Sequence, residues 1–215
     1  MTTDWGVRGA GPPATLFVCF FILLRRLFFR LRRTCFYVIL LSDIMRTTTF
    51  GTMLLVKDSP CLVTPLSGQT YITELINTVN RAKYSIDIIQ YPWNFYPDQP
   101  KSNIQILNRT LLARAGAGIK TRVLLEKGGS APHLTGINTK ASGFLQEAGV
   151  IVKLGRTFPI THAKIWIFDD DEVILGSHNL SNRSVTVNYE VSALIKGRAV
   201  AVEYRRYFNS LWDLL

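Results

Sequence analysis

Hydrophobic residues after residue 53 follow two spacings that alternate along the chain. They recur three or four positions apart, as on one face of a helix, in residues 68–83, 103–118, 139–149 and 199–215. Short apolar runs typical of strands occupy residues 84–93, 119–128 and 150–155. Alternating strands and helices predict an α/β sandwich, in which a mixed, mostly parallel sheet is flanked by helices.

A β-hairpin is predicted between residues 160 and 181. Apart from Lys164, residues 163–168 are aromatic, aliphatic and β-branched; residues 169–172 are four consecutive acids typical of a turn, and residues 173–175 are apolar again. Apolar residues occupy both alternating positions of the first strand, which suits a sheet covered on both faces.

Polar side chains of this hairpin can share one patch. Side chains two residues apart in a strand point the same way, so His162 and Lys164 lie together, as do Ser177 and Asn179 if the second strand extends that far. An ammonium binds phosphate as a point charge, and hydroxyl and amide groups donate to its oxygens. A neutral imidazole can attack as a nucleophile, and a protonated one can act as an acid. This set requires neither a metal nor another cofactor.

A carboxylate is also expected, because a catalytic imidazole is usually oriented by a third group. Glu190 is the main candidate for this carboxylate, and Asp169 is the alternative.

The acidic run 169–172 lacks the spacing of a calcium loop and is better explained as a solvated turn. Three scattered cysteines, Cys19, Cys35 and Cys61, indicate neither a zinc site nor a disulfide framework.

The spacing of these residues resembles the complete HKD motif of the phospholipase D superfamily. His162-x-Lys164 is followed after four residues by Asp169, and after six more by Gly176-Ser177-x-Asn179. The resemblance extends from about residue 53 to the end of the chain. It is strongest with small single-motif members, namely the bacterial Nuc-type endonucleases and the mitochondrial Zucchini-like phospholipase D proteins.

The resemblance implies metal-independent phosphodiester cleavage through a covalent phosphohistidine. It implies the superfamily's α/β sandwich fold and the following roles: His162 as nucleophile, Lys164 and Asn179 as phosphate ligands, Ser177 as support for the phosphate or for the partner motif, Glu190 as the group that orients the imidazole, and Asp169 and Gly176 as structural residues.

A single motif predicts a homodimer with a shared active site. The two-step reaction needs one imidazole to attack and a second acid to protonate the leaving oxygen. The sequence shows no internal repeat and supplies one such histidine, so we expect His162 from each of two subunits to face one phosphate.

Residues 1–52 are distinct from the expected catalytic domain, residues 53–215. Two apolar stretches within residues 15–44 are separated by a segment with five arginines, and each is too short to span a bilayer alone. Two explanations stand: a membrane-associated anchor, or a start assigned too far upstream, with Met45 or Met53 as the native start of a cytoplasmic protein.

The net charge of +10 suits a polyanionic partner, either nucleic acid or an anionic phospholipid surface. Three function classes follow: an endonuclease on DNA or RNA, a phospholipase acting on cardiolipin-like lipids, and a non-catalytic nucleic-acid-binding relative. The intact motif argues against the non-catalytic relative.

Weaker site candidates are the histidines His133 and His178. The aromatic residues of one loop could stack on bases or simply pack: Tyr91, Trp93, Phe95 and Tyr96.

Activity should survive EDTA, because the candidate site combines histidine, lysine and asparagine rather than a converging pair of acids. Diester hydrolysis measured before and after chelation checks this expectation. Loss of turnover with EDTA and its recovery with magnesium would contradict it.

Overall fold

The computed structural model describes residues 59–128, 131–156 and 159–215, all within one compact unit, Thr52–Leu215. The predicted N-terminal segment 1–52 lies outside the described residues, together with its membrane-associated stretch 15–44 and the candidate starts Met45 and Met53. Among the residues that are described, no helix combines the length and apolar character that a membrane span requires.

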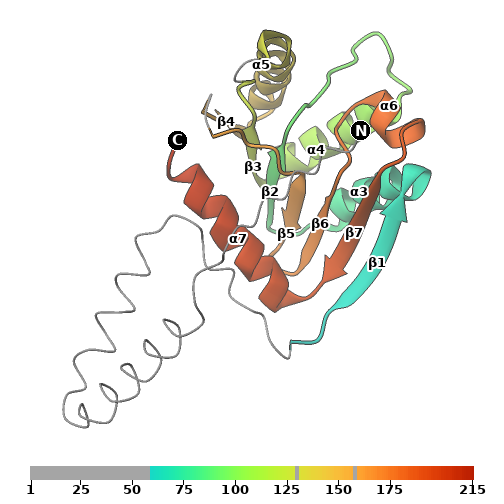
Figure 1. The fold of residues 1–215 in the computed structure, drawn as a ribbon, viewed down its shortest axis with the longest axis vertical. Coiled ribbons are helices and arrows are strands. Elements are labelled where there is room, and N and C mark those ends of the chain that lie inside the picture. The colour runs from blue at the N-terminus through green and yellow to red at the C-terminus, as the bar shows by residue number, and fades with distance from the viewer. Residues whose placement is uncertain (1–58, 129–130, 157–158) are drawn as a thin grey trace, which may run out of the picture. The chain divides into compact units, whose positions relative to one another are not determined.

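The described chain forms seven strands and five helices (Figure 1). In order they are β1 (Leu62–Ser67), α3 (Gly68–Arg81), β2 (Ser85–Gln90), α4 (Asn103–Gly116), β3 (Lys120–Leu125), α5 (Pro132–Glu147), β4 (Ile151–Leu154), β5 (Ile165–Phe168), β6 (Glu172–Gly176), α6 (Asn182–Thr186), β7 (Val191–Lys196) and α7 (Arg198–Trp212). The predicted helices, strands and hairpin are confirmed as α3, α4, α5, α7, β2, β3, β4 and β5–β6. The structure adds β1, α6 and β7.

The sheet is mixed, as predicted, but it is not mostly parallel. Its strand order is β1-β7-β6-β5-β2-β3-β4, and only β2–β3 and β3–β4 pair in parallel. The other four pairings are antiparallel. The physical reason is that parallel neighbours need a long crossover, which α4 and α5 supply, whereas β5 and β6 are joined by a tight turn that reverses the chain.

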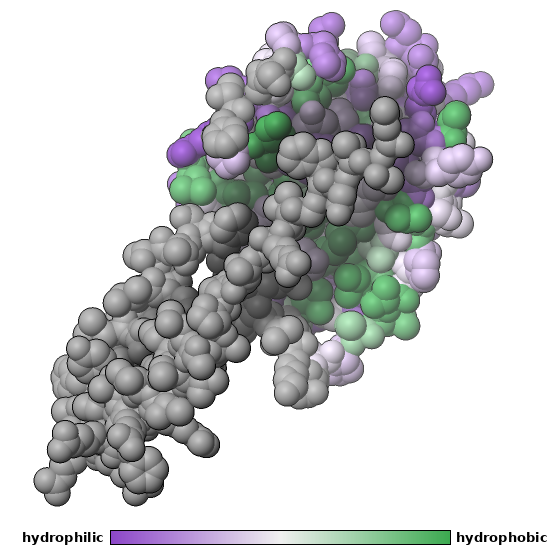
Figure 2. All heavy atoms as spheres, in the orientation of Figure 1, coloured by the Kyte–Doolittle hydropathy of each residue, from purple (hydrophilic) through white to green (hydrophobic). Residues whose placement is uncertain are grey.

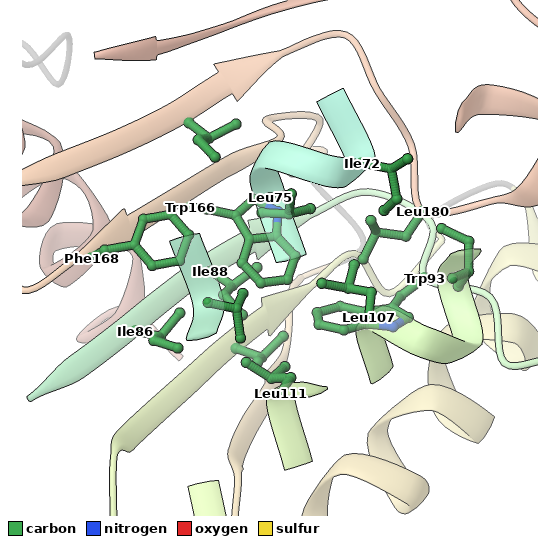
Figure 3. Packing of buried hydrophobic residues seen from close by; sticks show 14 of the residues in the cluster. Ile72, Leu75, Ile86, Ile88, Trp93, Leu107, Leu111, Trp166, Phe168 and Leu180 are labelled. Atoms are coloured by element: carbon green, nitrogen blue, oxygen red, sulfur yellow. The ribbon is translucent and has the colours of Figure 1, made fainter. Parts of the chain in front are cut away.

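Helices cover both faces of the sheet, as the pattern of β5 predicts. Trp166 and Phe168 pack into the larger core on the side of α3, α4 and α5, where Trp166 contacts Trp93 (Figure 3). Ile165 and Ile167 point to the other face, into the smaller core beneath α7. Apolar residues on both sides of one strand therefore fix β5 in the middle of the sandwich.

A buried ion pair ties α7 to the sheet. Asp87 on β2 is buried and accepts two hydrogen bonds from the Arg122 guanidinium, at 2.8 Å and 2.7 Å. Arg205 of α7 pairs with the same carboxylate. Because buried charges are costly unless paired, these contacts specify how α7 lies on the sheet.

The surface is divided between polar and apolar regions. In Figure 2, hydrophobic residues gather at the lower right, where Figure 1 shows β1 and β7. Leu62 and Val63 of the edge strand β1 and Val191 of β7 are exposed large hydrophobic residues of these two strands.

Asp169 holds the hairpin turn to the rest of the domain. Its carboxylate accepts backbone hydrogen bonds from Lys83 (2.7 Å), Tyr84 (2.7 Å) and Ser85 (2.8 Å), in the connection between α3 and β2. It follows the last residue of β5, whereas His162 precedes the first, so the length of the strand separates the two side chains. Asp169 is therefore not placed to orient the imidazole within its own chain.

Asp169→Asn should destabilise the domain by about 1–3 kcal/mol, because one of its oxygens becomes a donor facing backbone N–H groups. Asparagine tolerates the positive φ of 54° at this position, which leaves the hydrogen bonds as the main change. Urea denaturation measures the effect, with Asp171→Asn in the same exposed turn as the control. Equal stability of both variants would contradict the assigned role of Asp169.

Candidate active site

Strand directions bring the predicted site residues to one edge of the sheet. β2 and β3 end at this edge, and β5, which is antiparallel to β2, begins there. β6 ends and β7 begins at the same edge. The residues that flank these strand ends are His162, Lys164, Ser177, Asn179 and Glu190.

His162 and Lys164 are in direct contact, as their spacing predicts. The Lys164 Nζ lies 3.2 Å from His162 Nδ1 and 3.3 Å from Nε2, and it donates to the His162 carbonyl oxygen at 2.7 Å. Lys164 is only 8% exposed, whereas His162 is exposed. The Tyr91 ring lies 4.4 Å from the imidazole and 5.0 Å from the ammonium. An accessible imidazole is thus placed over a buried cation.

This environment keeps the imidazole neutral. Desolvation lowers the pKa of His162, the Lys164 ammonium lowers it further, and Glu126 opposes both effects. Desolvation also lowers the pKa of Lys164, while the negative charge of Glu190 acts in the opposite direction. A neutral imidazole has a free lone pair, so His162 can act as a nucleophile at neutral pH.

The second half of the motif lies just beyond β6, which ends at Gly176 rather than continuing to Asn179. The Ser177 hydroxyl donates to the Val191 carbonyl at 3.2 Å and accepts from the Val191 N–H at 3.1 Å. A Cβ at Gly176 would overlap Ser192 and the Val191 carbonyl oxygen. Close approach of β7 therefore requires glycine at this position.

Glu190 makes its hydrogen bonds with neighbours in sequence. It accepts from the hydroxyl of Ser184 (3.1 Å) and the amide of Asn188 (3.3 Å). Desolvation raises the pKa of this carboxyl, but the polar groups of Ser177, Asn188 and Ser184 outweigh that effect and lower the pKa. Glu190 is thus ionised, and its orienting role toward an imidazole stays a prediction.

His178 is buried and does not face substrate. Its ring stacks on Tyr71 at 3.8 Å, and its Nδ1 lies 2.8 Å from the Ser192 hydroxyl. The neighbouring Asn179 donates its backbone N–H to Ser184 at 2.9 Å, and its buried Oδ1 has no hydrogen-bond partner within the described chain. His178 therefore has a packing role: it connects the motif to Tyr71 and Ser192.

The aromatic loop residues divide into one site neighbour and three packing residues. Only Tyr91 contacts the motif. Trp93 is fully buried and donates to Asn108, Phe95 packs on Phe144, and the Tyr96 hydroxyl accepts from the Asn182 N–H. Of the two alternatives for Trp93, stacking on a base is excluded and packing is confirmed, because the ring lies inside the core. His133 is exposed at the start of α5.

Sequence reasoning missed Glu126. This carboxylate directly follows β3 and is 0% exposed; it accepts the N–H of Thr161 at 2.6 Å, one residue before His162, and that of Gly128 at 3.0 Å. The position of this acid, between an apolar strand and a glycine pair, could have identified it as a site candidate from the sequence.

In the described part of the chain, no group of three His, Cys, Asp or Glu residues could hold a metal ion.

Comparison with known proteins identifies the family. Residues 75–212 match the family model described as "Cardiolipin synthase, PLD-like domain", so the chain belongs to this phospholipase D-like family. The resemblance inferred from the HKD spacing is thereby confirmed.

Curated relatives carry two kinds of name. The chain is 25% identical over 171 residues, 74% of its length, to a protein from Xenopus laevis named 5'-3' exonuclease PLD3. It is 31% identical over 134 residues, 62% of its length, to cardiolipin synthase 2 from Staphylococcus epidermidis. The aligned region spans 33% and 25% of these two relatives.

Solved structures share the fold over almost their whole length. Nuc from Salmonella typhimurium matches 72% of this chain and 95% of its own, with a TM-score of 0.60 and 19% identity. NucT from Helicobacter pylori matches 72% and 97%, with a TM-score of 0.58 and 21% identity. The predicted phospholipase D-like fold is therefore confirmed.

Lys164→Met should lower kcat about 100-fold or more with little change in KM, because the ammonium stabilises charge that grows in the transition state. Methionine retains most of the apolar stem. Loss of the cation also raises the pKa of His162, so the acid limb of the pH–rate profile moves to higher pH. Lys153→Met on β4 is the control, and an increase in KM alone would assign Lys164 to substrate steering.

Proposed function

We propose that this protein hydrolyses phosphodiesters through a covalent phosphohistidine at His162, without a metal, and that its substrate is DNA or RNA cut internally. The observation that carries the proposal is the exposed, neutral imidazole 3.2 Å from the buried Lys164 ammonium. An anion drawn to that ammonium lies beside a nucleophile that retains its lone pair.

The reaction has two displacements at phosphorus. A His162 ring nitrogen forms a bond to phosphorus, the bond to the leaving oxygen breaks, and a protonated imidazole supplies the proton to that oxygen. Water then attacks phosphorus, gives its proton to the second imidazole, and the P–N bond breaks. Lys164 and Asn179 bind the phosphate oxygens, and Ser177 supports them.

The second imidazole is assigned to His162 of a second copy of this chain. Of the other histidines, His178 is buried against Tyr71, and His133 lies at the start of α5. The rim of the site carries exposed apolar residues on both sides of Glu190, namely Val187, Tyr189 and Val191, which suits a covered interface. In such a dimer, Glu190 of one subunit orients the imidazole of the other.

A nucleic acid substrate is supported by the basic composition and by similarity to the exonuclease from Xenopus laevis. The main alternative is a reaction on a cardiolipin-like phospholipid at a membrane. Similarity to the staphylococcal cardiolipin synthase and the matching family model favour that alternative. A non-catalytic role in nucleic-acid binding is disfavoured by the complete motif.

A substrate panel tests the proposed function. Wild-type protein and His162→Ala are incubated with labelled single-stranded DNA, with RNA, and with cardiolipin vesicles. Internal cleavage of a nucleic acid by the wild type alone supports the nuclease. Turnover of cardiolipin alone replaces it with the lipid alternative, and equal activity of the two proteins overturns the role of His162.

Mixed dimers should lose activity faster than the fraction of His162→Ala chains grows. Only a wild-type pair holds both imidazoles, so the rate follows the square of the wild-type fraction when subunits exchange freely. The measurement is a titration of variant into wild type with exchange verified independently. A linear decline would contradict the shared site.

A further inference from the structure

We propose that Glu126 is a positioning residue for His162 and acts within the same chain, by anchoring the backbone that precedes the imidazole. This inference rests on the proposed function of His162 as nucleophile. It concerns a residue outside the HKD motif, contributed by a different strand.

The placement of Glu126 is unusual for a charged side chain. It is 0% exposed, and within the described residues it forms no salt bridge. Its two oxygens instead accept separate backbone N–H groups, from Thr161 at 2.6 Å and from Gly128 at 3.0 Å. An ionised group removed from water is costly even with two hydrogen bonds, so its retention beside a reactive group indicates a functional constraint.

The bond to Thr161 acts where the chain has little other support. Residues 160–164 lie outside the strand ladder, which begins at Ile165. Fixing the Thr161 N–H therefore limits how far the next residue, His162, can move. Misplacement of a nucleophile by about 1 Å can cost roughly 100-fold in rate.

The backbone of Glu126 is linked to the Tyr91 side of the site. The Asn138 amide of α5 donates to the carbonyl oxygens of Glu126 (2.8 Å) and Tyr91 (2.6 Å). Its Oδ1 accepts the Trp93 N–H at 2.9 Å. The ends of β2 and β3 are thus joined, and both lie beside His162: the Tyr91 ring is 4.4 Å from the imidazole, and Glu126 holds the residue before it.

Two charges shift the pKa of His162 with opposite signs. The Lys164 ammonium, just before β5, lowers the pKa of His162, whereas the Glu126 carboxylate, just after β3, raises it. The Tyr91 ring contributes a neutral neighbour. Removal of the Glu126 charge therefore lowers the pKa of His162.

Two variants separate the hydrogen bonds from the charge. Glu126→Gln removes the charge and turns one acceptor into a donor. Glu126→Asp keeps the charge, but its shorter side chain cannot reach both N–H groups. Asp87→Asn is the matched control, because it removes another buried carboxylate, paired with Arg122 and Arg205.

The measurements are histidine NMR titration of the full chain and steady-state kinetics. For Glu126→Gln we expect kcat to fall about tenfold to 100-fold with KM nearly unchanged, and the His162 titration to move to lower pH. Glu126→Asp should lose kcat while its His162 titration stays near that of the wild type. Asp87→Asn should leave the His162 titration in place, which distinguishes positioning from loss of stability.

The proposal is overturned if Glu126→Gln keeps both wild-type kcat and the wild-type His162 titration. It is also overturned if Asp87→Asn, at equal loss of stability, reproduces the loss of kcat and the shift. The titration needs no turnover, so a wild-type protein that cleaves none of the tested diesters refutes the proposed function while the effect of Glu126 on His162 is still measured.

Discussion

The active site depends on the antiparallel pairing of β5 with β2. Their register joins Ile89 to Ile165, so Lys164, the residue before Ile165, lies beside the segment that follows Ile89 and contains Tyr91. Because β3 is parallel to β2, its end brings Glu126 to the same edge. A parallel β5 would place the HKD residues at the far end of the sheet, away from these neighbours.

The buried Lys164 ammonium places a positive charge at this edge of the sheet. The ammonium lies behind His162 and donates to its carbonyl oxygen, so its charge is fixed in a site of restricted solvation. Such a charge attracts an anion and at the same time keeps the neighbouring imidazole deprotonated. Glu126 moderates that effect from the end of β3. One buried cation thus couples phosphate binding to the availability of the nucleophile.

Sequence alone was sufficient for features that depend on local pattern. Aromatic and β-branched residues on both sides of the acidic turn predicted the hairpin, and spacing of two residues brought His162 and Lys164 into contact. The features that the sequence did not predict depend on contacts between residues far apart in the chain. Strand and helix alternation suggested a mostly parallel sheet, yet the antiparallel β1 and β7 and the hairpin change the balance. Glu126 was missed because its neighbour Thr161 lies 35 positions away in the sequence.

Stereochemistry at phosphorus tests the central claim most directly. A diester with a chiral phosphorothioate is hydrolysed in water labelled with heavy oxygen, which makes the product chiral at phosphorus, and the configuration of the product is determined. Each in-line displacement inverts phosphorus, so attack by His162 followed by attack of water predicts net retention. Net inversion would mean a single direct attack by water and would contradict the phosphohistidine intermediate.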